Sequence, residues 1–209
     1  MAGPVAGPYN PAHQVAMPRS DDLHQLPADL PVPVDDGACA HLPGLELPDL
    51  VLPSTSGAPV RLTALGAGWT VLYAYPRTGQ PDADPPGGLA AWDSIPGIRG
   101  CTPQACAYRD LHGEIAALGA RVLAVSAQSP AYQLEMATRL HLPFEVLSDE
   151  RLELTRALAL PTFTVAGLEV IRRLTLFVRD RRIENVVYPV FPPDADAERA
   201  LDWLRRRPA

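Results

Sequence analysis

Residues 100–110 read Gly-Cys-Thr-Pro-Gln-Ala-Cys-Ala-Tyr-Arg-Asp, a short stretch that carries two cysteines at the start of a helical pattern. Thr102 is a favoured helix N-cap residue and Pro103 is favoured at the first helical position, so the sequence predicts that a helix begins here. Apolar residues recur at intervals of three and four as far as Leu118, and Gly119 ends the pattern. We therefore expect a helix with one apolar face and a cysteine close to its amino end.

Buried strands are expected on both sides of this helix in the sequence. Residues 69–75 form an unbroken β-branched and aromatic run that Pro76 ends, which is typical of a central strand. The remaining expected elements are a short strand at 59–63, a second buried strand at 121–126, helices at about 130–140 and 149–159, a hairpin of 174–178 with 183–188, and an amphipathic helix at 194–206. The order β-α-β-α-β-β-α, with an extra strand or two in front, predicts a thioredoxin-like α/β fold with a central mixed sheet flanked by helices.

Two parts of the chain fall outside this pattern. Residues 1–38 are rich in proline and show little periodicity, which predicts a largely disordered tail before a domain that spans 39–209. Residues 79–97 contain many glycines and prolines, so they form a loop-like insertion in the domain. Its apolar residues Leu89, Trp92 and Ile95 leave two alternatives open: the insertion folds over a pocket or forms an interface, or it is a surface loop.

The composition narrows the class of protein. With 209 residues, 47% of them apolar and 20% charged, the chain has the balance of one soluble globular domain with a tail. Its formal net charge of −6 weighs against nucleic acid as a partner. No apolar run is long enough to span a membrane. The first residues lack the basic and apolar regions of a secretory signal, so we expect a cytoplasmic location.

Cys101 and Cys106 carry the chemistry that the sequence itself suggests. A cysteine at a helix N-terminus faces the positive end of the helix dipole, which favours the nucleophilic thiolate, and Arg99 adds positive charge. A thiolate reacts with a peroxide to give a sulfenic acid, which a second thiol can trap as a disulfide. The alternative is that the two cysteines are small buried apolar residues.

The third cysteine is distant from any motif. Cys39 lies in a tail-like stretch with His41 two residues away, and the four clustered ligands of a zinc site are not present around them. We therefore expect no metal site, and nothing in the sequence implies an organic cofactor.

The run from Gly100 to Asp110 resembles the active-site motif of the Q-type, or bacterioferritin-comigratory, peroxiredoxins, which is Gly-Cys-Thr-x-Glu/Gln-x-Cys-x-Phe/Tyr-Arg-Asp. Further segments resemble this family in the right order: 72–76 (Leu-Tyr-Ala-Tyr-Pro), 124–126 (Ala-Val-Ser), 142–149 (Leu-Pro-Phe-Glu-Val-Leu-Ser-Asp) and 173–178 (Arg-Leu-Thr-Leu-Phe-Val). The resemblance spans residues 42–205.

This resemblance implies a thiol-dependent peroxidase that reduces hydrogen peroxide and organic hydroperoxides. It implies that Cys101 is the peroxidatic cysteine and that Cys106 is the resolving cysteine. It places Arg173 beside the peroxidatic sulfur, where the fixed donors of a guanidinium suit both a thiolate and a peroxide oxygen. A thioredoxin-like dithiol protein is the implied reductant, and we expect a monomer or a weak homodimer without a cofactor.

One position departs from the family pattern. The family has a threonine three residues before the peroxidatic cysteine, but Ile98 stands there and cannot hydrogen-bond a peroxide. Thr78 is our candidate for the missing hydroxyl, because it follows Pro76, the strand-ending proline that the family places in the pocket. Arg172, the neighbour of Arg173, is expected to be a solvated surface residue on the opposite side of the strand.

Two other functions remain open from the sequence. A thiol–disulfide oxidoreductase with the same fold would need Cys-x-x-Cys, and the four-residue spacer between Cys101 and Cys106 argues against it. A redox sensor without enzymatic activity would oxidise Cys101 and dock a partner through the insertion. Rapid consumption of peroxide by the purified protein would separate both from a peroxidase.

Overall fold

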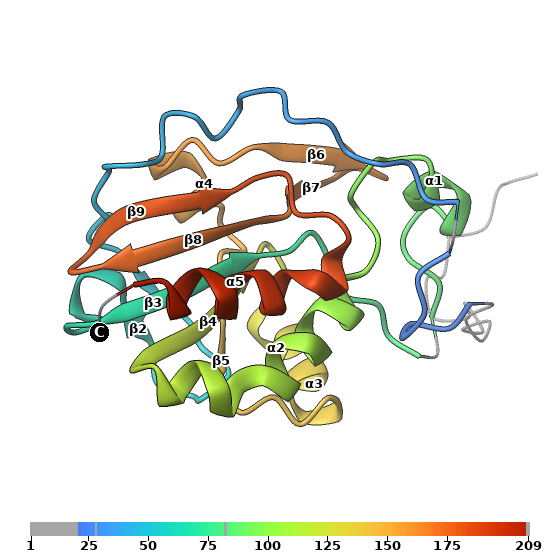
Figure 1. The fold of residues 1–209 in the computed structure, drawn as a ribbon. Coiled ribbons are helices and arrows are strands. Elements are labelled where there is room, and N and C mark those ends of the chain that lie inside the picture. Colours follow the sequence, from blue (N-terminus) through green and yellow to red (C-terminus); the bar gives the residue numbers. More distant parts are fainter. Residues whose placement is uncertain (1–20, 28, 82, 208–209) are drawn as a thin grey trace, which may run out of the picture.

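The structure is a computed structural model that describes residues 21–27, 29–81 and 83–207. Its centre is a five-stranded sheet with the order β5-β4-β3-β8-β9 (Figure 1). The strands are β3 (Trp69–Ala74), β4 (Ala120–Ser126), β5 (Glu145–Ser148), β8 (Leu174–Arg179) and β9 (Arg182–Val187). β3, β4 and β5 are parallel to one another, whereas β8 is antiparallel to both β3 and β9. The mixed sheet flanked by helices confirms the expected thioredoxin-like fold.

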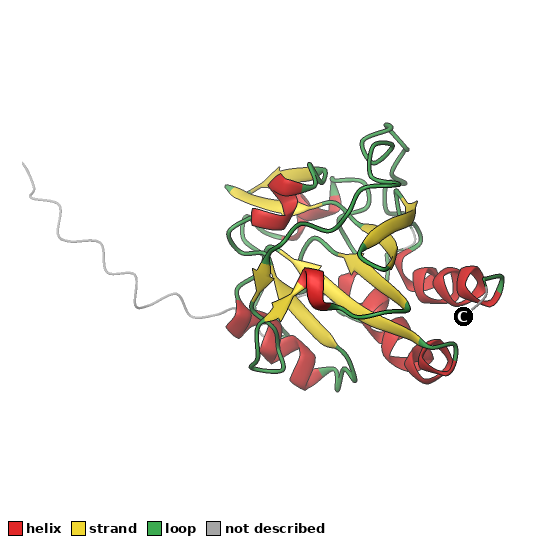
Figure 2. Ribbon diagram, turned by 90° about the vertical axis from the view of Figure 1, so that its left-hand side faces the viewer, coloured by secondary structure: helices red, strands yellow, loops and turns green. Residues whose placement is uncertain are grey.

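Helices cover both faces of the sheet (Figure 2). They are α2 (Cys101–Ala117), α3 (Pro130–Arg139), α4 (Glu153–Ala157) and α5 (Asp196–Arg205). Successive side chains of a strand point to opposite faces, so Tyr73 packs with α2, α3 and α5, while Leu72 packs with α4. Residues 42–65 lie on the α4 side with β1 (Val51–Leu52), β2 (Val60–Arg61) and the 3₁₀-helix η2 (Leu62–Ala64).

The sheet topology explains why distant segments meet at one edge. β8 runs antiparallel to β3, and Leu174 at its start pairs with Ala74 at the end of β3. Arg173 therefore lies beside the turn by which the chain leaves β3. Arg172 and Arg173 form the link between β7 (Leu168–Ile171) and β8 rather than part of a strand.

The start of α2 differs by two residues from the prediction. The helix begins at Cys101, and its N-cap is Gly100 in the left-handed region (φ 93°) rather than Thr102. A side chain on Gly100 would place a Cβ 2.5 Å from Cγ of Pro193, in the 3₁₀-helix η3 (Pro193–Ala195), so both conformation and packing require glycine. This cap puts Cys101 itself at the first helical position.

The fourth helix is shorter than the stretch 149–159 that the pattern predicted. Leu152 has a positive φ of 55°, which interrupts any helix that would start at Asp149. The Asp149 carboxylate instead accepts the backbone N–H groups of Leu154 and Thr155, and it thereby caps the first turn of α4. The hairpin of β6 (Thr162–Val165) and β7 was not predicted at all.

The insertion 79–97 contains the one-turn helix α1 (Leu89–Asp93). Its Trp92 is buried against Ile98 and against Val165 and Val170 of the β6–β7 hairpin. The Trp92 indole N–H donates to the carbonyl of Pro86 at 2.7 Å. The insertion therefore folds against the domain, as the first of the two sequence-based alternatives proposed.

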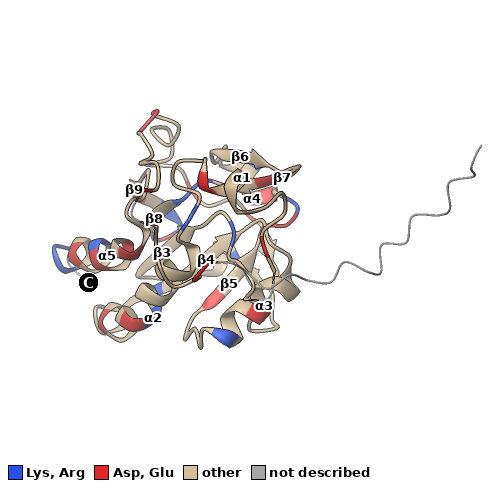
Figure 3. Ribbon diagram, turned by 90° about the vertical axis from the view of Figure 1, so that its right-hand side faces the viewer, with Lys and Arg blue, Asp and Glu red and all other residues tan. Residues whose placement is uncertain are grey.

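The described part of the predicted tail also lies on the domain. Asp21 forms an ion pair with Arg99, and Asp36 forms one with Arg172 at 2.9 Å. Residues 21–27 and 29–38, which the sequence assigns to a largely disordered tail, thus contact the domain, and residues 1–20 and 28 lie outside the described residues. Charges of both signs are interspersed over the side that Figure 3 shows. No helix in the described ranges is long and apolar enough to cross a membrane.

Candidate active site

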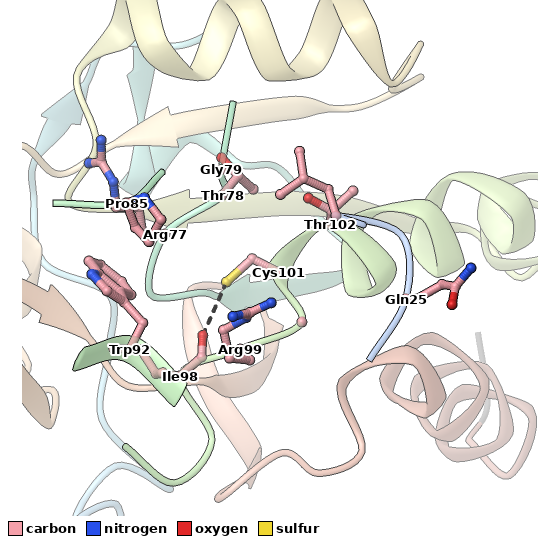
Figure 4. Close-up of a pocket in the computed structure, with 12 residues that line it drawn as sticks. Gln25, Arg77, Thr78, Gly79, Pro85, Trp92, Ile98, Arg99, Cys101 and Thr102 are labelled. Atoms are coloured by element: carbon pink, nitrogen blue, oxygen red, sulfur yellow. Dashed lines mark hydrogen bonds between the residues drawn. The ribbon is translucent and has the colours of Figure 1, made fainter. Parts of the chain in front are cut away.

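Cys101 lies at the carboxyl edge of the sheet, where α2 begins beside the chain that leaves β3. The residue is 4% exposed. The Sγ atom lies 3.7 Å from the carbonyl oxygen of Ile98, toward which the thiol can donate (Figure 4). Nη2 of Arg173 donates to Sγ at 3.1 Å. The structure thus brings together the cysteine and the arginine that the sequence places 72 residues apart.

The Arg173 guanidinium is held in one orientation by several acceptors. Arg173 as a residue is 2% exposed, and Nη2 also donates to the carbonyl oxygens of Ile98 at 3.3 Å and Arg99 at 2.9 Å. Nη1 donates to Oε1 of Gln104. A planar group with donors in a fixed fork can satisfy these acceptors and the sulfur together, which the single ammonium of a lysine cannot do.

A buried hydrogen-bond network continues from Gln104 to helix α5. Gln104 donates to Oδ2 of Asp196 at 2.7 Å, and the same oxygen accepts the hydroxyls of Thr175 at 2.7 Å and Tyr108 at 3.0 Å. Burial raises the pKa of Asp196, while these hydrogen bonds and the charge of Arg173 act in the opposite direction. The network fixes Arg173 through a residue that lies three positions after Cys101 and shares its helix face.

A cavity of about 40 Å³ opens beside Cys101 (Figure 4). A site of this kind needs only about 10–15 Å³ to hold one water, so this one accommodates a molecule of a few heavy atoms. The residues that line it are Leu23, Gln25, Arg77, Thr78, Gly79, Pro85, Trp92, Ile98, Arg99, Gly100, Cys101 and Thr102. The insertion, the described tail residues and the β3–α2 connection therefore all contribute to its wall.

Thr78, the candidate for the hydroxyl that is missing at Ile98, lies in the wall of this cavity. Its hydroxyl donates to Oε1 of Gln128 at 3.1 Å, and its backbone N–H donates to the same oxygen at 3.0 Å. The hydroxyl proton is therefore engaged, and its lone pairs remain able to accept a hydrogen bond. Pro76 is buried but is not one of the lining residues, and Ile98 contributes an apolar wall.

Cys106 lies on the second turn of α2 and is half-buried. Burial raises the pKa of its thiol, and the Asp110 carboxylate adds to that effect against the charge of Arg109. In an intact helix five residues span about 7.5 Å of rise and roughly 140° of rotation, which puts the two Cα atoms about 8–9 Å apart. A disulfide needs about 4.4–6.8 Å, so Cys101 and Cys106 can bond only if the start of α2 unwinds.

Cys39 is buried in the second apolar cluster, among residues such as Leu42 and Leu158. Burial raises the pKa of its thiol to about 12, and the charges of Asp35 and Asp36 contribute. A thiol with so little thiolate is a poor nucleophile. The residue therefore has the properties of a small apolar side chain.

We expect Cys39→Ala to leave peroxide reduction unchanged within about twofold, because only a thiolate attacks a peroxide. Steady-state peroxide consumption, compared with that of wild type, checks this. A loss of about tenfold or more with the fold intact would show that Cys39 takes part in turnover.

Arg172 differs from its expected role as a solvated residue. Its guanidinium donates to Asp36 and to the Tyr188 hydroxyl at 3.0 Å, and it lies over the ring of Phe163. It anchors the segment that precedes the domain.

Within the described residues, no three histidine, cysteine or acidic side chains form a group that could hold a metal ion.

Several residues of the site were not predicted from the sequence. Gln104 belongs to the quoted motif, and its position three residues after Cys101 could have marked it as a neighbour of the active sulfur. Asp196, Gln128 and the tail residue Leu23 come from distant parts of the chain. Only the fold brings them to the site.

The sequence and the fold of the chain are both similar to those of known proteins. A model of the redoxin family matches residues 42–201. The chain is 28% identical to the chloroplastic peroxiredoxin Q of Arabidopsis thaliana over 78% of its own length and 66% of that protein. Its fold is similar to peroxidoxin BcpB of Mycobacterium tuberculosis, with a TM-score of 0.65 and 27% identity over 80% of this chain and 98% of that one. It is also similar to the bacterioferritin comigratory protein of Xanthomonas campestris, with a TM-score of 0.60 and 25% identity over 77% and 96%.

Proposed function

The chain belongs to the redoxin family, and within it to the Q-type peroxiredoxins, and we propose that it reduces hydroperoxides through a sulfenic acid on Cys101. Members of this group are thiol-dependent peroxidases, which use a peroxide and a thiol reductant. The observation that carries the assignment of Cys101 is the distance of 3.1 Å between Nη2 of Arg173 and Sγ of Cys101. Cys101 lies in the wall of a cavity that is large enough for a small molecule.

In the first step, the Cys101 thiolate attacks the terminal oxygen of the peroxide. An S–O bond forms and the O–O bond breaks, and the leaving oxygen takes a proton and departs as water or an alcohol. The Nη2 group of Arg173 is placed to stabilise the negative charge as it passes from sulfur to oxygen. Thr78 can accept a hydrogen bond from the peroxide O–H, because its own proton is engaged by Gln128.

The cavity supports hydrogen peroxide and small organic hydroperoxides as substrates. Its volume of about 40 Å³ suits a peroxide group, and a larger alkyl group would have to displace Leu23 or Gln25 at its wall. The Xanthomonas protein has an alkyl peroxide reduction activity. We propose the same substrate class for this chain, with a preference for small peroxides.

In the second step, Cys106 attacks the sulfenic acid, an S–S bond forms, and the oxygen leaves as water. A thioredoxin-like dithiol protein then reduces the disulfide. The unwinding required at the start of α2 exposes the disulfide to such a partner, and Pro103 makes unwinding easier because it has no N–H to lose. A monomer or a weak dimer suffices, because both cysteines belong to one chain.

Cys106→Ser should leave Cys101 stalled as a sulfenic acid after one turnover, because no second thiol of the chain is placed to displace its oxygen. Trapping with a sulfenic-specific reagent and mass spectrometry measure this. In wild type, oxidation should raise hydrogen exchange in residues 101–110. An oxidised protein with a Cys101–Cys106 bond and unchanged exchange there would contradict the unwinding.

Thr78→Val should slow oxidation of Cys101 by about tenfold, because valine keeps the volume but offers the peroxide no acceptor. Thr78→Ser, which keeps the hydroxyl, should be mild. The second-order rate of Cys101 oxidation by hydrogen peroxide is the measurement. A valine effect of about twofold or less would mean that the hydroxyl is dispensable.

The function as a whole is tested by peroxide consumption with a thioredoxin system. A peroxidase consumes peroxide catalytically at the expense of the reductant. A thiol–disulfide oxidoreductase would instead reduce protein disulfides without peroxide, and a redox sensor would consume one equivalent and stop. The spacing of Cys101 and Cys106 and the cavity at Cys101 favour the first outcome.

A further inference from the structure

The described tail residues 21–27 lie across the start of α2 and reach both of its cysteines. Leu23 and Gln25 line the cavity at Cys101, and Leu26 packs against Gly100. Figure 4 labels Gln25 beside the start of α2. The ion pair of Asp21 with Arg99 holds this segment in place. These residues precede the part of the chain that matches the redoxin family, which begins at residue 42.

His24 lies beside Cys106. In the sequence it stands between Leu23 and Gln25, the two tail residues that line the cavity at Cys101. Its Nδ1 atom is 4.0 Å from Sγ of Cys106, within reach of a weak hydrogen bond to sulfur. Its backbone N–H donates to the Asp22 carboxylate at 2.8 Å, which fixes the turn that presents the ring. The imidazole is otherwise exposed, so it can exchange protons with water.

The other charged groups that act on Cys106 cannot take its proton near neutral pH. They are Arg109 and Asp110 of α2 and Arg139 of α3. Arginine stays protonated in proteins, and an exposed carboxylate is a much weaker base than a neutral imidazole. Histidine changes its charge between about pH 5 and 8, which suits it to accept and return a proton there.

We propose that His24 is the general base of the resolving step and takes the proton of the Cys106 thiol. This inference rests on the proposed function, in which Cys106 closes the disulfide on Cys101. The Cys106 thiolate attacks Sγ of the Cys101 sulfenic acid, the S–S bond forms and the S–O bond breaks. The hydroxide that leaves takes a proton from the imidazolium and becomes water, so His24 ends neutral and no other reagent is needed.

The environment of Cys106 explains why a base is useful. Burial raises the pKa of this thiol, so only a small fraction ionises unaided at neutral pH. The attack on a sulfenic acid requires the thiolate. A base in contact with the thiol supplies that form while the start of α2 unwinds.

The test separates the two steps in a single turnover with one equivalent of hydrogen peroxide. The rates are those of sulfenic acid formation and of disulfide formation, followed by rapid quenching and mass spectrometry. His24→Gln keeps a polar side chain of similar reach but cannot act as a base. His41→Gln is the matched control, because His41 bonds the Leu158 carbonyl on the other side of the sheet and glutamine can keep that bond.

We expect His24→Gln to slow disulfide formation at pH 7 by about tenfold or more, and to leave sulfenic acid formation within about twofold of wild type. The control should match wild type in both steps. The deficit of His24→Gln in disulfide formation should shrink as the pH is raised, because Cys106 then ionises without a base. Added imidazole should restore part of the rate in His24→Ala.

An unchanged rate of disulfide formation and an unchanged pH profile in His24→Gln would overturn the proposal. Equal slowing of both steps, without rescue by imidazole, would overturn it as well, because His24 would then only hold the tail in place. Failure of the proposed function looks different. If wild type forms no Cys101–Cys106 disulfide, the resolving role of Cys106 is wrong whatever His24 does.

Discussion

Cys101→Ser should abolish peroxidase turnover. Serine has almost the same size as cysteine, so the helix start, the cavity and the Arg173 contact can survive, but its hydroxyl does not ionise near neutral pH and is a poor nucleophile toward a peroxide. Initial rates of peroxide consumption with excess thioredoxin and its reductase measure the loss. We expect a rate at the background of the uncatalysed reaction.

The matched control for this variant is Cys39→Ala, which removes a buried thiol outside the site. If Cys101→Ser kept even about a tenth of the wild-type rate, the nucleophile would lie elsewhere. Cys39 would then be the next candidate, despite its burial and the high pKa of its thiol.

Arg173→Met should slow the oxidation of Cys101 by about two to three orders of magnitude, the range found when a preorganised donor to a developing charge is removed. Methionine fills much of the same space without a charge or a donor. The second-order rate of Cys101 oxidation by hydrogen peroxide, from stopped-flow fluorescence, is the measurement, and Trp92 in the cavity wall offers a signal. Circular dichroism checks that the fold survives.

Arg173→Lys separates charge from geometry. Lysine keeps the positive charge but cannot serve Cys101, the Ile98 and Arg99 carbonyls and Gln104 together, so it should recover only part of the rate. A lysine variant with full activity would show that charge alone matters. Unchanged oxidation in the methionine variant would make Arg173 a structural residue only.

The order and type of most main elements could be predicted from local patterns, although the strand β5 (Glu145–Ser148) of the central sheet was not among them. The apolar run at 69–75 and the apolar residues that recur every three or four positions after Cys101 each belong to one continuous buried segment. Burial of a continuous segment is visible as a pattern in the sequence. The start of α2 was misplaced by two residues because Thr102 and Pro103 are good capping residues wherever a helix starts. What decides the start is the contact of Gly100 with Pro193, and that contact is tertiary.

The shorter elements and the tail could not be predicted for related reasons. The β6–β7 hairpin and α1 are stable because Trp92, Val165 and Val170 bury one another, although each segment alone has too few apolar residues to fold. Residues 21–27 and 29–38 show little periodicity because they run over the domain as turns and irregular chain, without a helix or a strand. Ion pairs such as Asp36 with Arg172, rather than an amphipathic pattern, hold them there.

The residues of the site also fall into two groups, those that the sequence predicts and those that only the fold brings together. Cys101, Cys106 and Arg173 lie in segments whose residues resemble the family, so their places could be named from the sequence. Thr78 is a candidate because Ile98 leaves the family's hydroxyl position without a hydroxyl, and it lines the cavity. Asp196, Gln128 and His24 belong to no motif and enter the site only through the fold.

The central claim is that Cys101 reduces the peroxide and Cys106 closes a disulfide on it within one chain. Peptide mapping by mass spectrometry, after reaction of the reduced protein with one equivalent of hydrogen peroxide, tests it most directly. The account predicts an intramolecular Cys101–Cys106 bond, with Cys39 still a free thiol. A bond from Cys101 to Cys39 or to a second chain, or an oxidised protein in which Cys101 remains a free thiol, would contradict it.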